Sequence, residues 1–517
     1  MVSILVLVLG TGVASAAQLE LVTIDGSTER QIPARIRLRC ADGQDIVPPG
    51  AVEVPVRDDR WFVTSGTVRL ELPVGEIEIR VERGKEYIPV KERLTLGADG
   101  LTRHQISVRR WIDMQARGYL SGENHIHIAP TDLPAVLAAE DLNYGSSLYW
   151  WNGPKIPLSE GPEPVRTMSF GGITIPASVF DAEVEGDWGP AYLIGLQEPL
   201  PPDVDPSRPN LFYLIEGRRQ GALLCYNSGW AVESLFDALA GYVEVVDVCN
   251  NLFYRHRFAP RKGYSNLLGV EGLTVHEETP RGMFQMNLDA YYRLLNCGLQ
   301  IAAGADSAVG AKATPAGYNR AYVRRPAGAS LGEFLDGWRQ GRNFVTNGPM
   351  LFLTAGDAAP GDTLSAPGEG QTIEFRVQAI SNEPLESLEL IANGRVVATA
   401  QQGIGGREAT LVHKLSVRES TWVAARCADR EMLLSEEELE RYRRPPGKPR
   451  EEPCRLRFAH TSPIYATVAG SPVHVASSIE EARRILDAFE RFAEKKCGDR
   501  YRQELRQHLE AARSRLR

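Results

Sequence analysis

Two histidines one residue apart give the chain its clearest chemical signal. The stretch "GYLSGENHIHIAP" spans residues 118–130 and carries His125 and His127, two of the chain's nine histidines. In a β-strand, residues i and i+2 point to the same face, so both imidazoles can converge on one cation. Imidazole nitrogen is a good ligand for zinc, iron and manganese. The pair indicates either a metal-binding strand end or two partly exposed strand histidines.

A carboxylate at the end of a later strand is a candidate third ligand. Asp306 closes the apolar run "LQIAAGAD". A parallel α/β domain places its sites at the carboxyl ends of its strands, so we expect Asp306 to meet the two histidines there. The alternative for Asp306 is capping of the following loop or helix.

The segment that must position these residues alternates between strands and helices. Apolar runs are separated by helical stretches across residues 116–348, which predicts an α/β domain with a parallel sheet or barrel. Residues 331–348, at its end, have the spacing of an amphipathic helix. The runs predicted as strands include "GPAYLIGL", "GALLCYNSG", "YVEVVDVCNN" and "LQIAAGAD".

The segments on either side are predicted to be β-sandwiches. Residues 18–115 contain "TVRLELPVGEIEIRVERG", whose apolar residues alternate on both sides of residues 73–75 and predict a hairpin. This stretch resembles the small sandwiches of prealbumin-like or carboxypeptidase-regulatory-like domains. Residues 349–476 alternate similarly, and Asn393-Gly394 predicts a tight hairpin turn because both turn residues must adopt positive φ.

The end of the chain is predicted to be a helical tail over residues 477–517. Ser478 and Glu481 have the spacing of a capping box, and apolar residues follow at helical spacing. The apolar stripe is expected to pack on the body of the protein or on a partner chain, so helix-mediated self-association is one alternative. The charged, proline-rich residues 434–453 are expected to form an exposed insertion.

The first 17 residues have the pattern of a secretory signal peptide. An apolar run from Val2 to Leu9 precedes Ala14-Ser15-Ala16, an A-x-A-like cleavage site. We therefore expect an exported protein, periplasmic or secreted; the alternative is a buried N-terminal strand. We expect no transmembrane helix, because no stretch approaches about 18 apolar residues. The seven cysteines show no C-x-x-C and no obvious disulfide framework.

Composition narrows the classes of partner. The chain has 517 residues, enough for about three domains. Its net charge is −8 with no long basic run, so a nucleic-acid partner is not expected, because phosphate binding needs a clustered positive surface. No G-x-S-x-G, P-loop or G-x-G-x-x-G motif supports another enzyme class.

The middle of the chain resembles the CehA/McbA-type metallohydrolases, a branch of the PHP (polymerase and histidinol phosphatase) superfamily. The resemblance spans roughly residues 118–351 and rests on "GENHIHI", "VVDVCNNLFYRHRF", "GLQIAAGADSAVG" and "GRNFVTNGPML", among other stretches. It implies a central distorted (β/α)7 barrel that binds divalent metals. His125 and His127 match the family's H-x-H, and Asp306 matches its late Asp.

The family's ligand set is depleted in this chain. Ala308 stands where the late motif has a His, and Asn124 stands next to the H-x-H where an Asp is usual. The resemblance therefore implies one divalent ion (zinc, manganese or iron) rather than a cluster. Four further residues are candidates for the site, and each has a structural alternative: solvation of a helix end, a position in a surface loop, or packing in the core. These are Glu140 and His256 as ligands, and Trp151 and Asn250 as substrate-binding residues.

Two functions follow from these patterns. The first is an exported metal-dependent hydrolase, in which a metal-bound water attacks a phosphoester, carbamate, ester or amide of a small-molecule or carbohydrate-like substrate. The second is a catalytically degenerate barrel that serves as an exported binding or scaffolding module. The number of metal ligands that converge in space decides between them.

Overall fold

The computed structural model describes most of the chain. The described residues are 16–56, 59–98, 100–155, 163–202, 204–253, 266–277, 279–312, 314–367, 370–429 and 456–517. Residues 1–15 of the predicted signal peptide, His256 and the predicted insertion at 434–453 lie outside them. Strand β1 begins at Ala16, so the last two residues of the 1–17 segment are already part of a strand.

The described N-terminal strands form two sheets around one apolar core. They are β1 (Ala16–Asp25), β2 (Ala34–Cys40), β3 (Asp45–Ile46), β4 (Glu53–Val56), β5 (Asp59–Thr64), β6 (Thr67–Pro73), β7 (Gly75–Glu82), β8 (Val90–Leu96) and β9 (Leu101–Val108). One sheet has the order β6-β1-β9, and the other β4-β5-β2-β7-β8 with β3 on β2. Leu19 and Leu72 of the first sheet pack with Ile36 and Ile79 of the second.

The hairpin predicted around residues 73–75 is wrong in its pairing. Both strands form, but β6 pairs with β1 while β7 pairs with β2 and β8. Gly75 has a φ of 133°, a conformation that glycine tolerates, and there the chain passes from one sheet to the other. The apolar alternation was still informative, because Leu72 and Ile77 are buried in the same core.

The middle of the chain is built on an open mixed sheet. Its strands are β11 (Gly145–Trp151), β12 (Val165–Phe170), β13 (Ile173–Val184), β14 (Ala191–Ile194), β15 (Leu223–Tyr226), β16 (Val245–Cys249) and β17 (Ala302–Ala305). The order is β11-β13-β14-β15-β16-β17, with β12 on β13. β14 runs antiparallel to both of its neighbours, whereas β11–β13, β15–β16 and β16–β17 are parallel.

The predicted (β/α)7 barrel is therefore wrong. Within the described residues this sheet is an open path that ends at β11 and β17, and much of the rest of the protein is β-structure. The physical reason is the connections: β12–β13 and β13–β14 are antiparallel neighbours joined by short loops. A parallel barrel needs a crossover, usually a helix, between successive strands.

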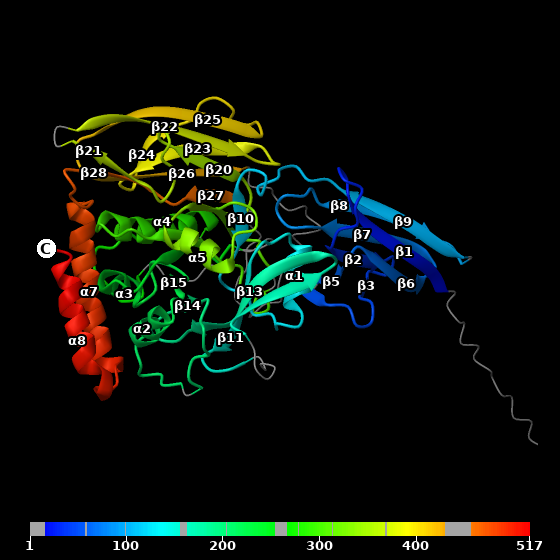
Figure 1. Cartoon of the computed structure of the whole chain (residues 1–517), viewed down its shortest axis with the longest axis horizontal. Helices are drawn as coiled ribbons and strands as arrows, with labels where there is room; N and C mark the ends of the chain where they lie inside the picture. Colours follow the sequence, from blue (N-terminus) through cyan, green and yellow to red (C-terminus); the bar gives the residue numbers. More distant parts are fainter. Residues whose placement is uncertain are drawn as a thin grey trace, which may run out of the picture.

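Helices pack around this sheet (Figure 1). They are α1 (Leu133–Ala139), α2 (Leu211–Arg219), α3 (Ser234–Ala240), α4 (Pro280–Asn296) and α5 (Leu331–Arg339). A capping box between Ser330 and Glu333 begins α5, and its apolar face buries Phe334 and Trp338. The helix ends well before residue 348, because Gly341 adopts a φ of 70° and the chain then enters a strand.

A second large sheet joins the middle of the chain to the C-terminal β-structure. It contains β10 (Tyr119–Gly122), β18 (Arg320–Arg324), β19 (Asn343–Thr346), β21 (Thr363–Ala366), β23 (Leu385–Ala392), β24 (Arg395–Thr399), β26 (Thr421–Asp429), β27 (Phe458–Thr461) and β28 (Ile464–Val468). A three-stranded sheet packs on it, formed by β20 (Met350–Thr354), β22 (Gln371–Ile380) and β25 (Glu408–Val417). The Asn393-Gly394 turn is confirmed, with φ of 48° and 83°.

The tail forms two helices, α7 (Ala476–Lys496) and α8 (Asp499–Ser514). The predicted capping box is wrong: Val475 is the N-cap of α7, and the hydroxyl of Ser478 accepts a hydrogen bond from Asn296. Both helices lie along α3, and α7 also contacts α4, so the apolar stripe is buried against the same chain (Figure 1). Self-association stays a prediction. None of the described helices has the length and apolar character to cross a membrane.

A buried histidine in β27 predicts acid sensitivity of the fold. His460 is fully buried; its Nδ1–H donates to the carbonyl of Thr461, and its Nε2 accepts from the Tyr292 hydroxyl. Burial and the nearby Arg426 lower the pKa of His460 to about 3. Below about pH 6.5 the unfolded chain takes up a proton that the folded chain does not, so stability falls as pH drops toward 3.

His460→Gln is expected to remove this contribution. The free energy of unfolding of the wild type should fall by about 1.4 kcal/mol per pH unit from this one group, and the variant should show a correspondingly shallower slope. Urea unfolding between pH 4 and pH 7 measures both slopes. The control is His474→Gln, because His474 is exposed. Equal slopes in the wild type and His460→Gln would contradict the prediction.

Candidate metal centre

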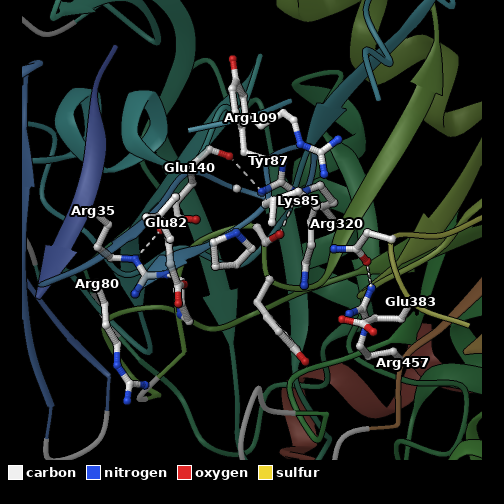
Figure 2. A pocket seen from close by; sticks show the side chains of 18 of the residues that line it. Arg35, Arg80, Glu82, Lys85, Tyr87, Arg109, Glu140, Arg320, Glu383 and Arg457 are labelled. Atoms are coloured by element: carbon white, nitrogen blue, oxygen red, sulfur yellow. Dashed lines mark hydrogen bonds and ion pairs between the residues drawn. The ribbon is translucent and has the colours of Figure 1, made fainter. Parts of the chain in front are cut away.

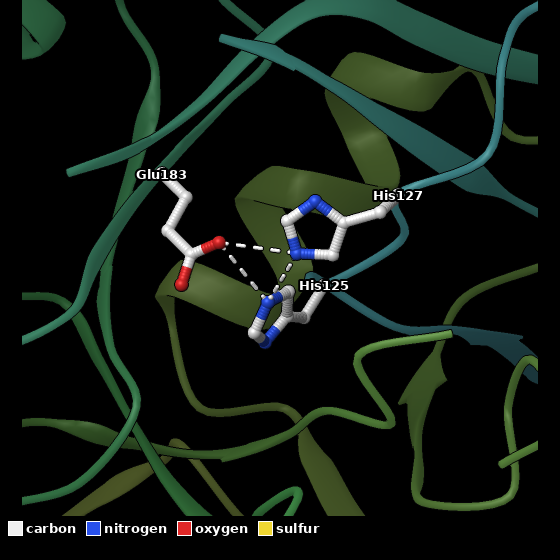
Figure 3. Close-up of side chains that lie close together, drawn as sticks. All are labelled: His125, His127 and Glu183. Carbon is white, nitrogen blue, oxygen red and sulfur yellow. Dashed lines mark hydrogen bonds and ion pairs between the residues drawn. The ribbon is translucent and has the colours of Figure 1, made fainter. Parts of the chain in front are cut away.

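Three side chains bring one ligand atom each to a single point. The ligand atoms of His125, His127 and Glu183 all lie within 4.8 Å of one another. The two Nε2 atoms are 2.8 Å apart, and Glu183 Oε2 lies 3.1 Å from that of His127 and 3.3 Å from that of His125. Figure 3 shows both rings and the carboxylate turned toward this point.

The backbone between β10 and α1 fixes the two histidines. Ile126 forms a parallel bridge with Val309, and its carbonyl accepts from the Leu148 N–H of β11. Ile126 is buried in the core, so the imidazoles on either side of it face the other way. Gly310 has a φ of 91°, and a Cβ there would lie 2.4 Å from the carbonyl oxygen of His127. A larger residue at 310 would push against the H-x-H segment.

The third group, Glu183, was not among the predicted site residues. It lies one residue before the end of β13, which runs parallel to β11 and so ends at the same edge of the sheet. A signal for it exists in the sequence, because Asp181 and Glu183 interrupt the otherwise apolar run "SVFDAEV". Carboxylates are almost never fully buried unless they are paired or bind a metal.

Asp306 lies behind His125 rather than beside the three ligand atoms. Its Oδ1 is 3.1 Å from His125 Nδ1, on the opposite side of the ring from Nε2. Asn227 Nδ2 donates to Oδ2 at 2.9 Å, and the Asn251 N–H donates to Oδ1 at 3.1 Å. A carboxylate in this position holds the Nδ1–H tautomer and leaves the Nε2 lone pair free for a metal. The structure thus gives Asp306 a positioning geometry and puts Glu183 in the predicted place of the third ligand.

These residues fit a divalent ion. Glu183 Oε2 is buried and has no properly oriented hydrogen-bond donor, although two imidazole nitrogens lie close to it. A four-coordinate zinc with ligands at about 2.0–2.1 Å spaces them about 3.3 Å apart, close to the observed edges. Three protein ligands also leave one position for water or substrate, as in catalytic zinc sites.

The charges of the site are strongly coupled. Burial disfavours the protonated form of His125, but Glu183 and Asp306 outweigh it and raise the pKa of His125 to about 10. Burial and the neighbouring His125 lower the pKa of His127. Burial opposes ionisation of Glu183, yet the two histidines hold its pKa at about 2. Glu183 is therefore an anion at neutral pH, as a metal ligand must be.

The other predicted residues are dispersed. The Trp151 ring lies 4.6 Å from the His127 ring and forms a wall of the site. Asn250 is buried, and its Nδ2 donates to the Asn227 carbonyl. Glu140 lies away from the three ligands and pairs with Arg35 at 2.7 Å. His256 lies outside the described residues.

Comparison with known proteins identifies no family for this chain. No family model and no curated protein matches the chain. Among solved structures, the minor pilin GBS52 of Streptococcus agalactiae is 18% identical over 19% of this chain and 46% of its own length, with a TM-score of 0.15. The Bacillus anthracis TIE protein is 14% identical over 23% of this chain and 20% of its own length, also at 0.15. This chain spans less than half of either protein, and at these TM-scores neither likeness indicates a shared fold or function.

Proposed function

We propose that this chain is a metal-dependent hydrolase with a single divalent ion held by His125, His127 and Glu183. The observation that carries the proposal is the convergence of Glu183 Oε2 and the two imidazole Nε2 atoms in a buried position, within 4.8 Å of one another. A buried carboxylate is costly unless a cation neutralises it; a protonated His125 does so without metal, and a divalent ion held by all three groups replaces that proton. When bound, a divalent ion supplies Lewis acidity that activates water and polarises an ester, carbamate, amide or phosphoester.

The residues around the ligands have separate tasks in this proposal. Asp306 orients His125, and the Tyr192 ring, 4.4 Å from the His125 ring, keeps water from that side. The side chain of His127 is 9% exposed and that of His125 is 4% exposed, so substrate approaches from the His127 side. Trp151 packs on His127 there and offers an aromatic surface to a substrate ring.

The test is turnover by the full chain after loading with zinc, manganese or iron. The substrates are p-nitrophenyl phosphate, p-nitrophenyl acetate and a p-nitrophenyl carbamate. We expect release of p-nitrophenol with at least one ion, loss after chelation, and background rates for His125→Ala/His127→Ala. His413→Ala/His474→Ala, away from the site, is the matched control. Turnover that survives chelation, or that is equal in both double variants, would contradict the proposal.

A structural ion in a binding or scaffolding module is the second candidate function. It is favoured by burial, because each ligand side chain is less than 10% exposed. Bound metal without turnover, together with lower thermal stability after chelation, would select this alternative. The three-ligand count argues against it, because structural zinc sites almost always have four protein ligands.

A further inference from the structure

A cavity of about 460 Å³ opens where the three parts of the molecule meet, away from the metal centre. One wall comes from β7 and the loop before β8, a second from the end of α1 and the loop before β18, and a third from the C-terminal β-structure. Figure 2 shows Arg35 and Arg80 on one side of it and Arg457 on the other. Its volume lies in the range of small-molecule sites, about 300–1,000 Å³.

The lining of this cavity is strongly basic. Eight of the lining residues are Arg or Lys and three are Glu, in a chain whose net charge is −8. A concave surface lined by one sign of charge, with low-dielectric walls, focuses the electrostatic potential and concentrates ions of opposite sign. The cavity therefore attracts anions although the protein as a whole repels them.

Part of this charge is balanced within the protein. Arg35 is neutralised by Glu82 at 2.8 Å and Glu140 at 2.7 Å. Arg80 lies 2.8 Å from Glu78, which is not a lining residue. Lys91 lies 3.1 Å from Glu78 and Arg457 lies 3.1 Å from Asp429, so these two cations are balanced as well. The lining cations outside these pairs determine the potential inside the cavity.

Two arginines of the lining keep uncompensated charge, and a third has an unpaired N–H group. Arg109 and Arg407 are exposed at the rim, and their side chains form no hydrogen bond or ion pair with any described residue. Arg320 lies at the floor, fully buried; it donates to the carbonyls of Gly317 and Glu140, and its Nη1 has no partner. Glu86 and Asp141 act on Arg320 electrostatically, but no carboxylate hydrogen-bonds to its guanidinium, so Nη1 stays available as a donor to an anion.

The walls also provide apolar and aromatic surface. Tyr87 and Tyr318 line the cavity together with Pro89 and Pro315. Arginine binds tetrahedral oxyanions through paired N–H donors, and tyrosine and proline surfaces suit a planar or sugar-like ring. We propose that this cavity binds a small organic molecule that carries a phosphate or sulfate ester group, at a site separate from the metal centre.

The test is calorimetric titration of the full chain with phenyl phosphate and, separately, phenyl sulfate, at low ionic strength and with a chelator present. The chelator keeps the metal centre from contributing. We expect saturable binding of one ligand per chain that weakens as salt is added. Binding of only one probe identifies the ester chemistry, and binding of both identifies a general oxyanion site; either supports the proposal.

Charge variants localise the binding. Arg109→Gln/Arg407→Gln should weaken binding by at least about tenfold, because two charge-assisted contacts are lost. Glu383→Gln should tighten it, since that substitution removes a negative charge from the lining. Arg93→Gln/Arg103→Gln makes the same charge change elsewhere on the N-terminal β-structure and should leave binding unchanged. No saturable binding to the wild type, or equal losses in both arginine double variants, would overturn the proposal.

Discussion

Glu183→Gln is expected to weaken zinc binding by more than about 100-fold, beyond the 10–100-fold effect of losing an outer-shell partner. Glu183 supplies the only anionic ligand atom among the three that converge. Glutamine keeps the size of the side chain but removes its charge, so the ion would be held by two neutral imidazoles alone. Competition against a chromophoric zinc chelator measures the affinity of the full chain.

The matched control is Glu185→Gln, the same substitution two residues further along. Glu185 is exposed and its Oε2 accepts a hydrogen bond from Trp151 Nε1 at 3.0 Å, so it lies near the site without facing the ligand point. Its zinc affinity should stay close to that of the wild type. If both variants lose affinity equally, general negative charge rather than ligation by Glu183 holds the ion; if neither does, the proposed centre is wrong.

The histidine pair of the site could be predicted from the sequence because its two residues are near neighbours along the chain. His125 and His127 need only the period of an extended segment to share a face, and Ile126 between them is buried as that period requires. Asp306 was found as a strand-end residue, and it does reach His125. Its role was not predictable, because the choice between ligand and orienting group depends on which ring nitrogen it meets.

Glu183 was missed because its contact with the histidines is set by long-range pairing. The register between β11 and β13 shifts at Leu148 and again before Trp150, and the end of β13 takes its place from that pairing. No spacing along the chain encodes such shifts. The available signal was the presence of two acidic residues in an apolar strand. It indicates that each carboxylate has a buried partner, but it does not identify that partner.

The predicted barrel is wrong because a short turn signal between two strands was overlooked beside the general alternation of strands and helices. Gly171 and Gly172 join β12 to β13, and both adopt positive φ, 55° and 78°. Two glycines between strand-like runs indicate a hairpin turn, which excludes a helical crossover at that point. The family resemblance supplied the closed barrel, whereas the residues themselves specified an antiparallel connection.

The second large effect is expected from Asp306→Asn, which should weaken zinc binding by about 10–100-fold. The Asp306 carboxylate can only accept a hydrogen bond, so it keeps the proton of His125 on Nδ1 and the lone pair on Nε2. Asparagine can present its NH2 group to Nδ1 instead. The proton then moves to Nε2, where it blocks ligation.

Nitrogen-15 NMR of the histidine rings separates this positioning role from simple loss of stability. At the same sub-saturating zinc concentration, His125 of the wild type should be protonated at Nδ1 and bound through Nε2, whereas Asp306→Asn should gain a population protonated at Nε2. Asp247→Asn is the control: burial and the nearby Asp306 raise the pKa of Asp247 well above its usual range, so an amide replaces a group that is already neutral. Asp247 accepts a hydrogen bond from Asn124 at 2.9 Å and also interacts with Asp306, to which an amide can still donate. Its variant should therefore keep both the tautomer and the zinc affinity. An unchanged His125 tautomer in Asp306→Asn, with zinc affinity intact, would show that Asp306 does not orient the ligand.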